Sequence, residues 1–113
     1  MKRLQECDER KLDELLTRPD PLLLHFGTDW CTPCKRLERV LLGVVESLPA
    51  RLAKINVEDH PDIAIAFSVT KNPTLCLFEG GDLVARHEGY LPSEGVLAFV
   101  RGHVSSSSLN EDV

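Results

Sequence analysis

The strongest pattern of hydrophobic and polar positions lies near the middle of the chain. Between Pro33 and Leu48 the apolar residues recur every three or four positions, as they do on one face of a helix. These residues are Leu37, Val40, Leu41, Val44, Val45 and Leu48. Pro33 suits a first helical turn, where the missing N–H would have no intrahelical partner, and Pro49 follows the last apolar position. The pattern predicts a helix over 33–48 that buries one face.

Shorter patterns of the same kind predict three more helices. We expect them over 8–18, 60–67 and 93–104. Asp8 and Ser93 are the expected N-caps of the first and the last, because a short side-chain oxygen can accept a hydrogen bond from a free backbone N–H of the first turn.

Four apolar segments between these helices are short enough to be strands. The expected strands are 22–26, 52–57, 74–78 and 83–87. A Gly-Gly-Asp turn separates the last two, which predicts a hairpin. Strands interleaved with helices predict an α/β fold in which helices cover a mixed sheet.

The length of 113 residues fits one domain, which we place over 1–104. The remaining segment, 105–113, opens with four serines and is expected to be a flexible polar tail.

A net charge of −5, from 13 basic and 18 acidic residues, argues against nucleic-acid binding, which draws most of its affinity from Lys and Arg. No apolar run is long enough to cross a membrane, and the charged start lacks the apolar centre of a secretory signal. We therefore expect a cytoplasmic protein.

Two of the four cysteines carry the clearest chemical signal. Cys31 and Cys34 lie in the segment Trp-Cys-Thr-Pro-Cys-Lys, between a predicted strand and the long helix. Cys31 falls at the helix N-terminus, where free N–H groups and the helix dipole stabilise a thiolate, the form that attacks disulfides. Cys34 follows about one turn later and can attack the resulting mixed disulfide. The spacing predicts a redox-active pair, with Cys31 as nucleophile and Cys34 as resolving thiol.

An alternative for a Cys-x-x-Cys pair is half of a zinc site, which needs a second pair of ligands. The other candidate ligands are scattered singly and show no metal-type spacing; they are Cys7, Cys76, His25, His60, His87 and His103. We therefore predict no metal site.

From about residue 4 to 104, the chain resembles the thioredoxin family. The matching features occur in order along the chain: the strand entering Phe26, the Trp-Cys-x-Pro-Cys-Lys motif, the Ala-Lys-Ile-Asn-Val strand at 53–57, Asn-Pro-Thr at 72–74, Gly81 in the hairpin turn and Gly89 after it. The resemblance implies a thioredoxin fold, with four or five strands in a mixed sheet and about four helices. It also implies a protein-disulfide reductase that needs no cofactor beyond its own disulfide and receives electrons from a thioredoxin reductase. We expect a monomer.

The resemblance also implies where a client protein binds. Pro73 is expected to be a cis-proline beside the disulfide, which leaves the backbone of Asn72 free to pair with an extended substrate chain. The expected substrate-binding residues are Trp30, Thr32, Pro33, Asn72, Pro73 and Gly89. An alternative is a thioredoxin-fold binding or chaperone module, in which the surface around Trp30 and Asn72 docks a partner and the cysteines matter little.

His25 is the main departure from the family pattern, which has a buried Asp at this position. The resemblance places His25 behind Cys34 and close to Lys54. An imidazole can also take the proton of the resolving thiol, so His25 and Lys54 are candidate catalytic residues. The alternative is that His25 only packs in the core. Its position within an apolar strand predicts burial and a neutral ring in either case.

The two remaining cysteines are expected to differ in environment. Cys76 alternates with leucines on a predicted strand, which predicts a buried, inert thiol. Cys7 lies near the terminus, where we expect it to be exposed.

Overall fold

The computed structural model describes residues 4–105. Its four strands are β1 (Leu22–Gly27), β2 (Arg51–Asn56), β3 (Thr74–Glu79) and β4 (Asp82–Glu88). They form one sheet in the order β2-β1-β3-β4, in which β1 and β2 are parallel and the other pairs are antiparallel. The predicted mixed sheet and its C-terminal hairpin are confirmed. The tail predicted for 105–113 lies, beyond its first residue, outside the described residues and stays a prediction.

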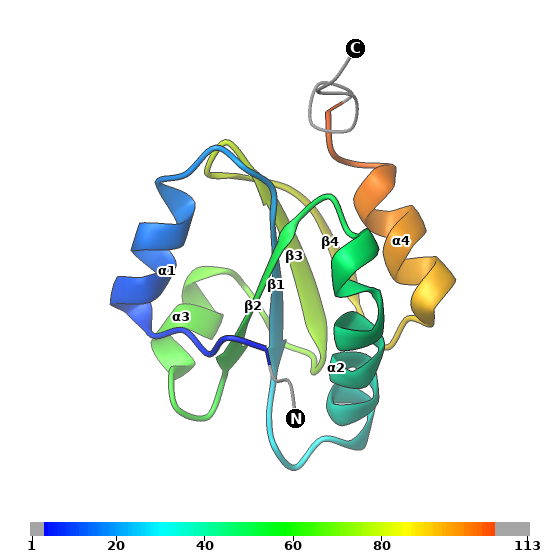
Figure 1. The fold of residues 1–113 in the computed structure, drawn as a ribbon. Helices are drawn as coiled ribbons and strands as arrows, with labels where there is room; N and C mark the ends of the chain where they lie inside the picture. Colours follow the sequence, from blue (N-terminus) through cyan, green and yellow to red (C-terminus); the bar gives the residue numbers. More distant parts are fainter. Residues whose placement is uncertain (1–3, 106–113) are drawn as a thin grey trace.

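The helices are α1 (Glu9–Leu16), α2 (Thr32–Val44), α3 (Pro61–Ala66) and α4 (Ser93–Arg101), and a 3₁₀ turn (Val45–Ser47) extends α2. Figure 1 shows α2 and α4 on one face of the sheet and α1 and α3 on the other. Two hydrophobic cores follow from this arrangement, one on each face. Within residues 4–105, no helix is long and apolar enough to cross a membrane.

The two-residue period of β1 decides which of its side chains face α2. Leu22, Leu24 and Phe26 belong to the core under α1 and α3, whereas Leu23 belongs to the core under α2. Because successive side chains of a strand point to opposite faces, His25 lies on the α2 side with Leu23. His25 also pairs with Lys54 in the parallel register of β1 and β2, so both side chains project toward the same helix.

The segment before α1 corrects one expectation from the sequence. Cys7 is buried, with 3% of its surface exposed, because the chain runs beside β2 before it enters α1. The Cys7 N–H donates to the Lys54 carbonyl at 2.8 Å, and burial raises the pKa of the thiol to about 11. Cys76 is fully buried on β3, as predicted, and its pKa is likewise raised to about 11. Both thiols lie in the core opposite α2.

The helix ends also refine the predictions. Asp8 caps α1 as expected, since its carboxylate accepts a hydrogen bond from the Lys11 N–H at 2.8 Å. The prediction for Ser93 is wrong, because Pro92 takes the cap position of α4 and Ser93 is the first helical residue. The helix ends at Arg101 rather than at 104, because Gly102, a poor helix former, follows directly.

Candidate active site

The N-terminus of α2 presents the two cysteines of the motif at the end of β1. Cys31 is the N-cap, with an extended backbone, and its Sγ accepts a hydrogen bond from the Cys34 N–H at 3.2 Å. The two cysteines are joined as a disulfide. When the pair is reduced, the same N–H and the helix dipole favour the negative charge of a Cys31 thiolate.

The two sulfurs differ in their access to solvent. Cys31 is half-buried, whereas Cys34 lies beneath it with only 2% of its surface exposed. Trp30, directly before the pair, is 81% exposed, and Thr32 and Pro33 are exposed on the first turn of α2. An incoming disulfide can therefore meet Cys31 but not Cys34.

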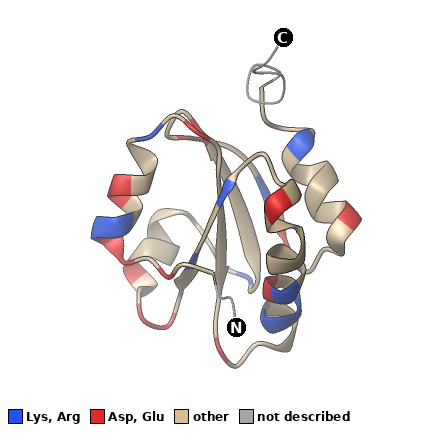
Figure 2. Ribbon diagram, in the orientation of Figure 1, with Lys and Arg blue, Asp and Glu red and all other residues tan. Residues whose placement is uncertain are grey.

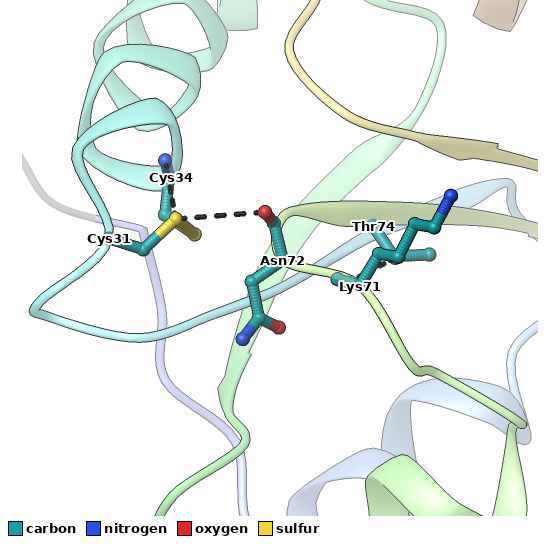
Figure 3. The surroundings of a disulfide bond; sticks show 5 residues. All are labelled: Cys31, Cys34, Lys71, Asn72 and Thr74. Carbon is teal, nitrogen blue, oxygen red and sulfur yellow. Dashed lines mark hydrogen bonds between the residues drawn. A yellow bond between two sulfur atoms is a disulfide. The ribbon is translucent and has the colours of Figure 1, made fainter.

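A distant segment of the chain completes the exposed side of the site. The Asn72 carbonyl oxygen lies 3.7 Å from the Cys31 Sγ, and Figure 3 shows it directed at the sulfur while the Asn72 side chain points away. A Cys31 thiol can donate to this carbonyl when the pair is reduced. The Asn72–Pro73 peptide bond is cis, as the resemblance implied, and the Pro73 carbonyl accepts a hydrogen bond from the Gly89 N–H at 2.7 Å. The fold thus brings Asn72, Pro73 and Gly89 to the cysteine pair.

Charged side chains on neighbouring elements also lie around this segment. Lys71 and Glu88 form an ion pair across the strand ends at 3.9 Å. The Arg36 guanidinium lies over the Tyr90 ring, 4.8 Å from its centroid, which links α2 to the segment that follows Gly89. Figure 2 shows basic residues gathered on the first turns of α2, where Lys35, Arg36 and Arg39 lie.

His25 lies beneath the disulfide and is 3% exposed, so its predicted burial is confirmed. Neither ring nitrogen has a hydrogen-bond partner among the described residues. Burial lowers the pKa of His25 to about 4; the nearby Lys54 ammonium adds to this effect, and the Glu38 carboxylate opposes it. The ring is therefore neutral at pH 7, as expected from its strand.

Lys54 is paired with a residue that the sequence analysis missed. Its Nζ donates to both carboxylate oxygens of Glu38, at 3.0 and 3.3 Å, and the two side chains are only 13% and 21% exposed. Glu38 follows Cys34 by four residues, so both lie on the same side of α2. That spacing was visible in the sequence, but the lysine that fixes the carboxylate comes from a strand sixteen residues further on.

Gly27 lies against both His25 and Cys34. A Cβ atom at this position would lie 2.9 Å from the Cys34 Sγ and 3.0 Å from the His25 Cε1. The absence of a side chain therefore lets the imidazole and the buried sulfur approach the same point. A small cavity beside it is lined by residues that include His25, Gly27, Glu38 and Lys54.

No group of three or more His, Cys, Asp or Glu side chains within residues 4–105 has an arrangement that could hold a metal ion. What the site holds is a disulfide between one accessible and one buried cysteine, with a backbone acceptor in front and an unpaired imidazole behind. This arrangement is suited to the exchange of two electrons between dithiol and disulfide.

Comparison of the sequence with known proteins points to one family. The sequence model of the family described as Thioredoxin matches residues 4–102. The chain is 37% identical over 84 residues to Thioredoxin 1 of Chlorobaculum tepidum, covering 72% of this chain and 83% of the relative. It is 30% identical over 89 residues to thioredoxin of Mycoplasma genitalium, covering 78% of this chain and 87% of the relative.

Solved structures agree with the sequence comparison. The fold superimposes on a mutant thioredoxin from Halobacterium salinarum with a TM-score of 0.83 and 30% sequence identity, covering 90% of each chain. Oxidised mitochondrial thioredoxin 3 of Saccharomyces cerevisiae gives a TM-score of 0.79 at 27% identity, covering 88% of this chain and 94% of that one.

Proposed function

This chain belongs to the thioredoxin family and is a thiol–disulfide oxidoreductase acting on protein disulfides, and we propose that Cys31 is its nucleophile and Cys34 its resolving thiol. The observation that carries the assignment of roles is the difference in exposure at the N-terminus of α2. Cys31 is accessible, and its Sγ accepts a hydrogen bond from the backbone N–H of Cys34. The Cys34 side chain is buried beneath it.

In the proposed cycle, the Cys31 thiolate attacks one sulfur of a client disulfide. A bond forms between Cys31 and the client, and the other client sulfur leaves as a thiolate. Cys34 then loses its proton and attacks the Cys31 Sγ, which releases the second client sulfur. Two electrons pass from the protein to the client, and the Cys31–Cys34 disulfide seen in the structure is the product.

We assign the proton of Cys34 to His25. The neutral imidazole has a free lone pair, and neither ring nitrogen is hydrogen-bonded to any described side chain or backbone group. Gly27, which has no side chain, leaves open the space between the ring and Cys34. General-base assistance is typically worth about 10²–10⁴-fold. His25→Ala should therefore slow resolution of a mixed disulfide and leave the first attack by Cys31 nearly unchanged, and His25→Asp should recover much of the rate. Stopped-flow kinetics on a preformed mixed disulfide separates the two steps; an unchanged resolution rate in His25→Ala from pH 6 to 9 would mean that His25 only packs.

The proposed client-binding surface surrounds Cys31. An extended client segment would pair with the backbone at Asn72 and lie between Trp30 and Gly89, while Thr32 and Pro33 border it on the α2 side. The exposure of Trp30 supports this arrangement, because a large exposed aromatic ring is a common anchor in protein interfaces.

The source of electrons and the place of action are also part of the proposal. We infer that a thioredoxin reductase reduces the disulfide and that the protein works as a monomer in the cytoplasm. The unpaired Cys7 and Cys76 thiols fit a reducing compartment, where protein thiols are rarely oxidised.

Reduction of insulin disulfides by dithiothreitol tests the function. Wild-type protein should accelerate the reduction, and Cys31→Ser should not. Cys34→Ser should instead accumulate mixed disulfides with clients, because Cys31 can still attack but nothing releases the product. If Cys31→Ser binds clients as well as wild type and neither protein accelerates reduction, the chain is a binding module and not a reductase.

A further inference from the structure

The ion pair between Glu38 and Lys54 lies on the buried side of the active site, next to His25. Glu38 projects from α2 on the side of Cys34, and Lys54 projects from β2 beside His25. Both line the small cavity that also borders His25 and Gly27. A partly buried pair at this point acts more strongly on its neighbours than a surface pair would, because water screens it less.

The charges of this pair act on His25 in opposite directions. When His25 accepts a proton, its ring becomes a cation with little access to solvent. The Lys54 ammonium disfavours that cation and the Glu38 carboxylate favours it. Asp29, in the loop after β1, is the other ionisable side chain along this cavity, and it is exposed to solvent.

We propose that Glu38 is a positioning residue for the resolving step, whose carboxylate neutralises Lys54 and stabilises His25 in its protonated form. The proposal rests on the role of His25 proposed above. Without Glu38, the proton released by Cys34 would have to enter a buried site that holds an unpaired ammonium. With Glu38, the same transfer leaves a carboxylate in the same cavity as the two cations.

The two members of the pair should therefore have opposite effects on His25. Glu38→Gln leaves Lys54 uncompensated, so the pKa of His25 should fall by about one pH unit. Lys54→Gln leaves the carboxylate uncompensated, so the pKa of His25 should rise by a similar amount. A purely structural role of the pair would move His25 in the same direction in both variants, because either substitution breaks the same ion pair.

Nuclear magnetic resonance can follow the His25 ring protons of the oxidised protein between pH 2 and 8, a range that also covers a pKa one pH unit below about 4. His25→Ala identifies the signal among those of the four histidines. Glu46→Gln is the matched control, because it removes one carboxylate from the exposed turn after the same helix. Stopped-flow resolution of a mixed disulfide should be about three- to tenfold slower in Glu38→Gln and unchanged in Glu46→Gln.

Shifts of His25 in the same direction in both variants, or no shift in either, would overturn the proposal. A normal resolution rate in Glu38→Gln, with a slow rate in His25→Ala, would overturn it as well. If the shifts are opposite but His25→Ala resolves at the normal rate, the electrostatic role of Glu38 stands and the proposed proton transfer to His25 is wrong. These outcomes therefore distinguish a failure of the role proposed for Glu38 from a failure of the role proposed for His25.

Discussion

Gly27 is the position at which a single methyl group should disturb both the stability and the redox chemistry of the protein. It is buried at the end of β1, and a Cβ there would lie 2.9 Å from the Cys34 Sγ, 3.0 Å from the His25 Cε1 and 3.1 Å from the Cys34 Cβ. Contacts this short require atoms to move. Gly27→Ala should therefore push apart the imidazole and the buried sulfur.

The size of the effect follows from two opposing contributions. An added methyl group in a packed core typically costs about 1–3 kcal/mol. Replacing Gly by Ala also makes the unfolded chain less flexible, which contributes roughly 0.4–1 kcal/mol in favour of folding. The net loss should be about 1–2 kcal/mol. Gly43→Ala is the matched control, because nothing lies within 4 Å of its added Cβ in α2, and it should stabilise the protein by up to about 1 kcal/mol.

The oxidised protein should suffer more than the reduced one. In the disulfide the Cys34 Sγ is held in place, whereas a reduced thiol can turn away from the added methyl group. The reduction potential of Gly27→Ala should therefore rise, by about 30 mV for each 1.4 kcal/mol of difference between the two forms. Gly43→Ala should leave the potential unchanged.

Chemical denaturation of both redox forms and equilibration with glutathione measure these quantities. Equal stability of Gly27→Ala and Gly43→Ala would refute the reasoning about the close contact. A loss of stability with an unchanged potential would mean that the methyl group displaces His25 and not the sulfur.

Three further predictions test other parts of the structure. Iodoacetamide should modify Cys31 before Cys34 in the reduced, folded protein, and peptide mapping that finds Cys34 modified first would reverse the assigned roles. Because the pKa of His25 is lowered to about 4 from an ordinary 6.5, the unfolded chain takes up its proton first as the pH falls. The free energy of unfolding should therefore drop by up to about 3 kcal/mol between pH 6.5 and 4, more steeply than in His25→Ala, and parallel pH profiles of the two proteins would contradict this. Asp8→Ala should cost about 1 kcal/mol of stability through the lost cap of α1, and an unchanged denaturation midpoint would show that water replaces the cap.

The sequence by itself determined the features that depend on neighbouring residues. Helical spacing after Cys31 placed the pair at a helix N-terminus, because residues three apart in a helix lie about one turn from each other. The apolar residues on both sides of His25 in β1 were enough to predict its burial. The thioredoxin fold followed from motifs in a set order along the chain.

The tertiary structure decided which distant residues meet. The Asn72 carbonyl reaches the Cys31 Sγ from 41 residues away, and Lys54 finds Glu38 across 16 residues. Periodicity tells which face of an element is buried, but not which side chain of another element lies opposite, since that depends on strand register and on the rotation of α2 over the sheet. The same limit explains Cys7, whose burial depends on a bridge to β2 that no local pattern encodes.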